Sequence, residues 1–344
     1  MLNRSPVVRL SPTAQRLNYV GDGSSVGLMV KYRIVFREHQ MMKCPSPIAG
    51  MVWPARPLDD YLGELRAHGY TVVDGLISDA ALERIKTVTA QQIAQLEPAP
   101  PAFDDRFGVP HGIAWSQDVC NAVTHPAALW VLRAYLGASN IRFCHQPAMT
   151  VLRPAKDLIG QFPEAGWHAD YPYHPDVYPD DRWRDDAVYG VQFNLCVDAF
   201  RPENGATQYV PDSHLRRRWP PRALNEGGTR IGTAPHDQVM QMQAPAGSAL
   251  IYDSRTWHRA CPELNVSGED RLAILNAVCP AWVRSMVDKQ AGTERYRASN
   301  MAAQLDPQVR DEIEALCHAD RIPPPAGAPV ILEKQFVGPR KIQI

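Results

Sequence analysis

Five short runs of β-forming residues constrain the fold of this chain more than any other feature. Clusters of proline, glycine, asparagine and aspartate separate the runs, which occupy residues 141–152, 187–197, 207–210, 249–253 and 271–278. Few helical segments lie between them, so most of them cannot be joined by the helical crossovers that parallel pairing requires. The pattern therefore favours an antiparallel barrel or sandwich over a β-α-β sheet.

Helices are predicted on both sides of this β-rich region. The segment from Leu58 to His68 has apolar residues at helical spacing, acidic residues at its start and Gly69 where a helix would stop. Similar patterns cover residues 79–95 and 126–136, and Asp306-Pro307 begins another. The sequence thus predicts an α+β protein with a mainly β core and flanking α-helices.

The composition is that of an ordinary globular protein and shows no sign of nucleic-acid or membrane binding. The 344 residues include 36 basic and 37 acidic ones, and this net charge of -1 supplies no broad positive field. No apolar run is long enough to span a bilayer and no secretory signal is visible, so we expect a cytoplasmic protein. The seven cysteines form no C-x-x-C pair, which predicts neither disulfides nor a thiolate zinc site.

The first 50 residues lack a sustained period of either secondary structure. We expect them to form a poorly ordered extension. A second interpretation is an initiation codon assigned too early, because Met41, Met42 and Met51 all precede the first clear element. Residues 51–344 are expected to form a single domain, with a helical N-terminal part and a C-terminal helix and tail.

The segment Gly166-Trp167-His168-Ala169-Asp170-Tyr171 carries the strongest chemical signal. Residues two apart in an extended chain point to the same side, so His168 and Asp170 would present an imidazole and a carboxylate together. His258, which ends a second apolar segment, is the best candidate for a third ligand. Non-haem Fe(II) oxygenases use two histidines and one carboxylate, and some zinc hydrolases do so too, although the H-E-x-x-H helix is absent here.

An isolated H-x-D pair also arises by chance, so it needs support from another residue. Arg271 supplies this third element of the pattern. It opens the run 271–278. An arginine at the mouth of a β-barrel can hold the distal carboxylate of a dicarboxylate through a two-pronged contact that lysine cannot reproduce. Arg271 thus indicates a carboxylate cosubstrate, although a surface arginine at the end of a strand would look the same by itself.

With these residues in place, the chain resembles the phytanoyl-CoA dioxygenase-like family of Fe(II)- and 2-oxoglutarate-dependent oxygenases. Five ordered blocks between about residues 57 and 285 carry the resemblance, and the block over residues 203–214 (ENGATQYVPDSH) is the most specific. The other four are Gly69-Tyr70-Thr71-Val72-Val73, Trp167-His168-Ala169-Asp170, Trp257-His258 and Arg271.

The resemblance implies a double-stranded β-helix, which is a cupin-like jelly-roll barrel with helices packed outside. It implies that His168, Asp170 and His258 bind Fe(II) and that Arg271 binds the C5 carboxylate of 2-oxoglutarate. The implied reaction uses O2 to hydroxylate a small-molecule substrate and converts 2-oxoglutarate into succinate and CO2. Halogenases of this superfamily lack the carboxylate ligand, so Asp170 argues against halogenation.

The resemblance also suggests residues beside the cosubstrate and two departures from the family pattern. Thr207 and Asn194 are expected next to 2-oxoglutarate, and Met149 is a weaker candidate for the same wall. Asp212 stands where the family's turn has glycine, so this aspartate would have to adopt a positive φ. Ala260 replaces a residue that carries a hydroxyl in some members.

The substrate is less constrained by the sequence. Residues 171–186 can be read as a lid over the site or as a surface loop with buried tyrosines. The basic run at residues 216–218 can be a phosphate site for a CoA ester or a solvated face. Near the third ligand, Tyr252, Arg255 and Trp257 can be pocket wall or core, whereas His174 and His214 are expected to be loop and turn residues rather than ligands.

Two other classes of function compete with an oxygenase. A non-catalytic jelly-roll binding module would keep the barrel without using the metal, but it would not need His168, Asp170, His258 and Arg271 together. A cupin-type metal hydrolase or isomerase would use the metal, but it gives no role to Arg271 or to the block at residues 203–214.

Overall fold

Two glycines end helices where the sequence predicted. The helix α1 (Leu58–His68) ends at Gly69 and α5 (Pro126–Leu136) ends at Gly137, and these glycines adopt φ values of 77° and 60°. A left-handed residue of this kind lets a backbone N–H return to the last turn, as Gly69 does to the Leu65 carbonyl. The helix α2 (Asp79–Ile93) begins after Ser78, whose hydroxyl accepts from the Ala81 N–H.

A computed structural model describes most of the chain. The described residues are 43–96, 106–154, 166–184, 186–221, 224, 239–286 and 290–317, and all of them belong to one unit that spans residues 42–344. The predicted N-terminal extension lies outside them apart from residues 43–50, which form neither helix nor strand. The predicted tail after residue 317 lies outside them as well.

A six-stranded antiparallel sheet forms the centre of the fold, in the order β1-β7-β4-β9-β3-β2. Every neighbouring pair runs antiparallel, as the lack of helical crossovers predicted. The strands are β1 (Tyr70–Val73), β7 (Ala249–Asp253), β4 (Val191–Cys196), β9 (Arg271–Pro280), β3 (Ile141–Leu152) and β2 (Arg106–Val109).

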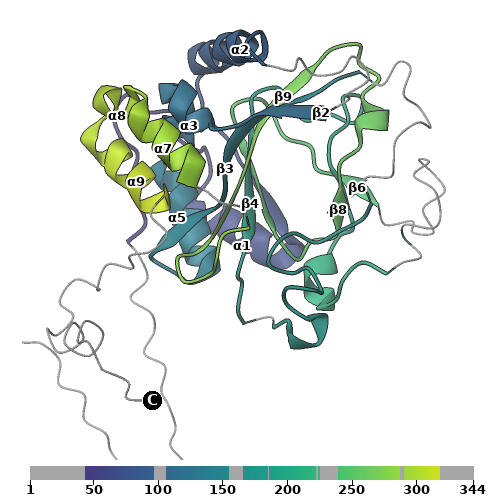
Figure 1. Ribbon diagram of the computed structural model, residues 1–344. Helices are drawn as coiled ribbons and strands as arrows, with labels where there is room; N and C mark the ends of the chain where they lie inside the picture. Colours follow the sequence, from purple (N-terminus) through teal and green to yellow (C-terminus); the bar gives the residue numbers. More distant parts are fainter. Residues whose placement is uncertain are drawn as a thin grey trace, which may run out of the picture. The chain divides into compact units, whose positions relative to one another are not determined.

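A smaller sheet lies opposite, in the order β6-β5-β8. Its strands are β6 (Met240–Gln241), β5 (Gln208–Tyr209) and β8 (His258–Arg259). Figure 1 shows β6 and β8 on the side of the large sheet away from the helices. A buried apolar cluster joins the two sheets, because Tyr209 and Met242 pack with Leu250 and Tyr252 of β7.

The helices cover the other face of the large sheet. Besides α1, α2 and α5 they are α3 (Gly112–Trp115), α4 (Gln117–Val123), α7 (Gln290–Ala298), α8 (Met301–Gln304) and α9 (Pro307–Cys317) (Figure 1). The largest core lies between this layer and the sheet, where Leu132 of α5 and Ile313 of α9 share a cluster with Phe193 and Ile274. The fold is therefore an α+β jelly roll with flanking helices, as expected.

Several elements were not predicted from the sequence. They are β2, β6, β8 and the short helices α3, α4, α7 and α8, whose few residues carry little periodicity of their own. One departure from the family pattern is confirmed, because Asp212 adopts φ 56° before a 3-10 turn. None of the seven cysteines, all of which are described, forms a disulfide. In the part of the chain that is described, no helix has the length and apolarity needed to cross a membrane.

Candidate metal centre

The two predicted histidine ligands meet between the sheets. His168 forms an isolated antiparallel bridge with His258 of β8, in which each backbone N–H donates to the other residue's carbonyl, at 3.1 and 3.0 Å. Asp170 is held two residues later, because its N–H donates to the Ser254 carbonyl at 2.6 Å. Backbone pairing therefore brings together three side chains that are far apart in the sequence.

The three side chains form a compact set of ligand atoms. One nitrogen from each histidine and one oxygen of Asp170 all lie within 4.8 Å of one another. The Nε2 atom of His258 is 3.2 Å from one Asp170 oxygen, and the Nε2 atom of His168 is 3.8 Å from the other. Within the described residues, this is the only group of three such side chains that can hold a metal ion.

Hydrogen bonds on the far side of each ring orient the imidazoles. The Nδ1 atom of His168 is 2.7 Å from the Gly166 carbonyl, and that of His258 is 2.8 Å from the Thr256 carbonyl. A carbonyl can only accept, so each Nδ1 carries a proton, and the neutral form of each imidazole has its lone pair on Nε2, where it can bind a metal. The donor set and its tautomers fit a divalent ion such as Fe(II).

The charge state of Asp170 also suits a ligand. Burial by itself would raise the pKa of this carboxyl, but His258 beside it, with smaller effects from His168 and His145, holds the pKa below its ordinary value. Asp170 is therefore an ionised carboxylate at neutral pH.

A buried ion pair fixes the turn that leads into His258. The Arg255 guanidinium contacts both oxygens of Asp253, at 2.9 and 2.6 Å, and Tyr135 of α5 donates to the same carboxylate at 2.6 Å. Burial would raise the pKa of Asp253, but Arg255 and Tyr135 keep it below its usual value. The Gly69 carbonyl accepts from Asp253 N and from the Thr256 hydroxyl, which ties the same turn to the end of α1.

A cavity of about 340 Å³ contains the three ligand side chains and the predicted cosubstrate residues. Arg271, Thr207 and Asn194 all line it, as does Ala260. Arg271 Nη1 donates to the Gly205 carbonyl at 2.6 Å, and its guanidinium carbon lies 4.0 Å from the centre of the Phe200 ring. These contacts place a cation in the same cavity as the candidate metal ligands.

Met149 does not belong to this wall, contrary to expectation. Ala148, Thr150 and Leu152 of β3 line the cavity, whereas Met149 is fully buried in the core on the helical side, where the Thr89 hydroxyl donates to its sulfur. Successive residues of a strand face opposite sides of a sheet, so Met149 points away from the cavity that its neighbours Ala148 and Thr150 line.

The structure also shows which residues near His258 belong to the pocket wall and which belong to the core. Tyr252 lines the cavity, with its hydroxyl 3.5 Å from His258 Nε2. Trp257 is fully buried and donates to the Arg218 carbonyl, and Arg216 and Arg218 lie over its ring, so it belongs to the core together with Arg255.

The remaining histidines and the loop fit their structural interpretations. His174 is half exposed and packs on Trp219, and His214 is buried, with its Nε2 3.3 Å from the Arg66 carbonyl. The loop over residues 171–186 buries Tyr173 and Trp183 in a separate cluster with Ala169, and none of its described residues lines the cavity.

Sequence reasoning missed His145 and Gln192, which also line the cavity. Gln192 lies two residues before Asn194 on β4, so the spacing of two could have indicated it. His145 lies in a part of β3 where the pairing with β9 shifts between residues 143 and 148, and no alternation predicts its face.

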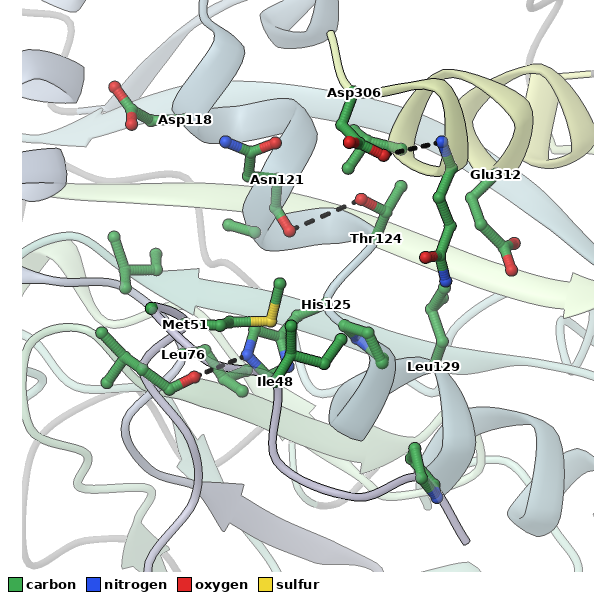
Figure 2. A pocket seen from close by; sticks show the side chains of 18 of the residues that line it. Ile48, Met51, Leu76, Asp118, Asn121, Thr124, His125, Leu129, Asp306 and Glu312 are labelled. Carbon is green, nitrogen blue, oxygen red and sulfur yellow. Dashed lines mark hydrogen bonds between the residues drawn. The ribbon is translucent and has the colours of Figure 1, made fainter. Parts of the chain in front are cut away.

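A second and larger cavity, of about 640 Å³, lies on the helical side and contains none of the candidate ligands (Figure 2). Its charged walls pair with one another: Arg84 with Asp118 at 2.7 Å, and Arg133 with Glu312 at 2.7 Å. His125 bonds to the Val52 carbonyl there. None of the candidate metal ligands or predicted cosubstrate residues lines this cavity, so it is not part of the candidate metal centre.

Comparison with known proteins identifies a family. The phytanoyl-CoA dioxygenase (PhyH) family model matches residues 65–273, which is more than half of the chain. Dioxygenase af480 of Aspergillus fumigatus is 26% identical over 278 residues, covering 76% of this chain and 78% of its own. An uncharacterized protein of Mycobacterium tuberculosis is 24% identical over 236 residues, covering 67% of this chain and 78% of its own.

Two solved structures show a similar fold. HygX from Streptomyces hygroscopicus, with nickel, 2-oxoglutarate and hygromycin B bound, is 16% identical with a TM-score of 0.48, covering 66% of this chain and 88% of its own. The non-heme alpha-ketoglutarate-dependent carbocyclase SnoK from nogalamycin biosynthesis is 18% identical with a TM-score of 0.47, covering 68% of this chain and 89% of its own.

Proposed function

Because the chain belongs to the phytanoyl-CoA dioxygenase family of Fe(II)- and 2-oxoglutarate-dependent oxygenases, we propose that it hydroxylates a small organic molecule. The proposed reaction consumes O2 and 2-oxoglutarate and releases succinate and CO2. The observation that carries the proposal is that His168, Asp170 and His258 share one cavity with Arg271.

The three ligand side chains would hold Fe(II) on one face and leave the other positions for small molecules. Bound Fe(II) would supply the redox chemistry by which O2 oxidises both 2-oxoglutarate and substrate. The protein prepares this site in two ways. The bonds from Nδ1 to the Gly166 and Thr256 carbonyls aim both imidazoles, and the bond from the Asp170 N–H to the Ser254 carbonyl holds the carboxylate residue beside them.

Arg271 would bind the C5 carboxylate of 2-oxoglutarate. Phe200 supports one face of the guanidinium and the Gly205 carbonyl fixes one Nη1 donor, so the group is oriented before the cosubstrate arrives. Thr207 and Asn194 would contact the cosubstrate between Arg271 and the metal. Asn194 supports this role because its Oδ1 is buried and bonds to no described residue, while its Nδ2 donates to Tyr252 at 3.4 Å.

The proposal is tested by coupled turnover. Protein loaded with Fe(II) and supplied with O2 and 2-oxoglutarate is expected to form succinate and CO2 in equal amounts, more slowly without substrate than with it. The Asp170→Ala variant should form neither, because it removes the only carboxylate ligand. Equal succinate formation by both proteins would refute the proposed function.

One observation favours an oxygenase over the competing classes, and a second favours hydroxylation among the oxygenase reactions. The Arg271 guanidinium is oriented in the metal cavity, where it can bind a dicarboxylate cosubstrate. A binding module or a cupin-type hydrolase would have no role for it. The carboxylate of Asp170 is held among the ligands, and this favours hydroxylation over halogenation.

A further inference from the structure

The register of the large sheet gives the metal cavity two distinct ends. On β9, Arg271 pairs with Leu152 of β3, and six residues later Ala277 pairs with His145 of β3 and Gln192 of β4. At about 3.4 Å per residue, these two levels are about 20 Å apart along the strand. His145 and Gln192 therefore flank a small alanine at the end of the cavity opposite Arg271.

The metal ligands lie close to the end with Gln192. His258 contacts the Tyr252 hydroxyl, and Tyr252 pairs with Gln192 in the register of β4 and β7. A cosubstrate that runs from the metal to Arg271 would leave the end with Gln192 and His145 for the molecule that is oxidised.

Gln192 is a buried amide with hydrogen-bonding capacity directed into the cavity. The residue is only 6% exposed and lines the cavity, and among the residues that the structure describes none bonds to its side chain. A buried amide without a protein partner is costly unless a ligand or water satisfies it. His145 adds a second polar group at the same level, with only a long 3.4 Å contact to the Gln146 carbonyl.

The loop at this end exposes two large apolar side chains, with the exposed Arg284 between them in the sequence. Met286 lines the cavity and is 49% exposed, which places the mouth beside it, and its N–H donates to the carbonyl of Cys144, next to His145. Trp282 on the same loop is 63% exposed, and its ring packs on Tyr189 with centroids 5.3 Å apart. Large exposed apolar side chains beside a cavity mark a surface that a ligand covers.

We propose that Gln192 and His145 determine substrate specificity by hydrogen-bonding a polar group of the substrate, while Met286 and Trp282 pack on its apolar part. The inference rests on the proposed function, because it assigns the substrate end of the same site. Arg271 is the only lysine or arginine among the described lining residues, and it lies at the other end. The part of the substrate that enters is therefore neutral and amphipathic, such as a ring with a hydroxyl or carbonyl, and it carries no phosphate or carboxylate.

The test uses the anaerobic Fe(II)·2-oxoglutarate protein and three probes: 2-naphthol, 2-naphthoate and acetyl-CoA. Calorimetric titration should show 2-naphthol binding at least about 10-fold more tightly than either anionic probe, because a carboxylate or phosphate inside this end of the cavity would lose its hydration where no described lining residue is a lysine or arginine. Equal or tighter binding of 2-naphthoate or acetyl-CoA, or no binding of 2-naphthol, would overturn the proposal. Failure to form the Fe(II)·2-oxoglutarate complex at all would instead refute the proposed function.

Two variants assign the binding to these residues. Gln192→Leu keeps the size of the side chain and removes the amide, so it should weaken 2-naphthol about 10-fold while the dissociation constant of 2-oxoglutarate stays the same. Trp282→Ala lies on an exposed loop and should also weaken 2-naphthol, whereas Val266→Ala, at another site of 63% exposure, should not. If Trp282→Ala and Val266→Ala bind 2-naphthol equally, the rim has no role and the proposal is wrong.

Discussion

His168 and His258 lie opposite each other in an isolated antiparallel bridge, in which the backbone N–H of each residue donates to the carbonyl of the other. The centroids of their rings are 4.4 Å apart. The bridge is the physical link between an H-x-D motif in a loop and a histidine at the start of β8. It fixes both imidazoles through the main chain, so the metal site does not depend on the packing of the side chains alone.

Removing one ligand should therefore abolish metal binding and leave the fold intact. We expect His168→Ala and Asp170→Ala to lose Fe(II) affinity by at least about 10-fold, with an unfolding midpoint within a few degrees of the parent protein. His174→Ala is the matched control, because His174 is exposed and lies outside the ligand cluster. Retention of iron by Asp170→Ala would contradict the assignment of the ligands.

Arg271→Lys should raise the KM for 2-oxoglutarate with a smaller change in kcat. The lysine keeps the charge but cannot reproduce the planar fork or the contact with the Phe200 ring. We expect a rise of at least about 10-fold, because a charge-assisted bond contributes about 1.5–3 kcal/mol. Initial rates at varied 2-oxoglutarate provide the measurement, and an unchanged KM would assign the carboxylate to another residue.

Asp253→Asn should destabilise the protein strongly, since it leaves the buried Arg255 guanidinium without its counter-charge. The expected loss is about 3–5 kcal/mol in urea unfolding, whereas Tyr135→Phe removes one charge-assisted hydrogen bond to the same carboxylate and should cost less, about 1.5–3 kcal/mol. Similar losses in the two variants would show that the ion pair has no special role.

The same carboxylate predicts acid sensitivity. The pKa of Asp253 in the folded protein lies below its unfolded value, which is about 3.9. Its contribution to stability is therefore complete above the unfolded pKa and is lost as the pH falls through the folded one. Stability of the parent protein should decline more steeply below about pH 4 than that of Asp253→Asn. Parallel curves for the two proteins would contradict this.

Gly69→Ala should disturb both stability and the metal site. Gly69 has φ 77°, and a Cβ atom there would lie 2.5 Å from His214 Nδ1 and 2.8 Å from the Thr256 hydroxyl. Gly137→Ala is the control, because that residue also has a positive φ but open space around it. The control should lose about 1–2 kcal/mol and Gly69→Ala clearly more, together with weaker Fe(II) binding. Equal losses of stability in the two variants would mean that the protein accommodates the added Cβ atom at residue 69 without a further loss of stability.

The sequence predicted the parts of the site that reside in local patterns. His168 and Asp170 are two residues apart in extended chain, Arg271 opens a strand, and Asp212 accepts the left-handed conformation of the glycine it replaces. Each of these depends on a few neighbouring residues, and the resemblance to the family supplied their order along the chain.

Other features depend on contacts that local patterns do not encode. Both faces of β3 are largely buried, so its alternation does not say which face meets the cavity, and Met149 was placed on the wrong side. His145 lies in an irregular part of the same strand. Arg255 pairs with Asp253 only in the folded turn, so the sequence alone did not predict this ion pair. Sequence periodicity gives the spacing of side chains but not the phase of a strand that is buried on both sides.

The most direct test of the account is an anaerobic absorbance titration of metal-free protein with Fe(II) and then 2-oxoglutarate. The account predicts that a weak visible charge-transfer band appears with both additions, saturates at one equivalent of each, and is lost in Arg271→Ala at the same 2-oxoglutarate concentration. A protein that binds Fe(II) but develops no band, or a band of equal strength in Arg271→Ala, would contradict the central claim that these four residues form one cosubstrate site.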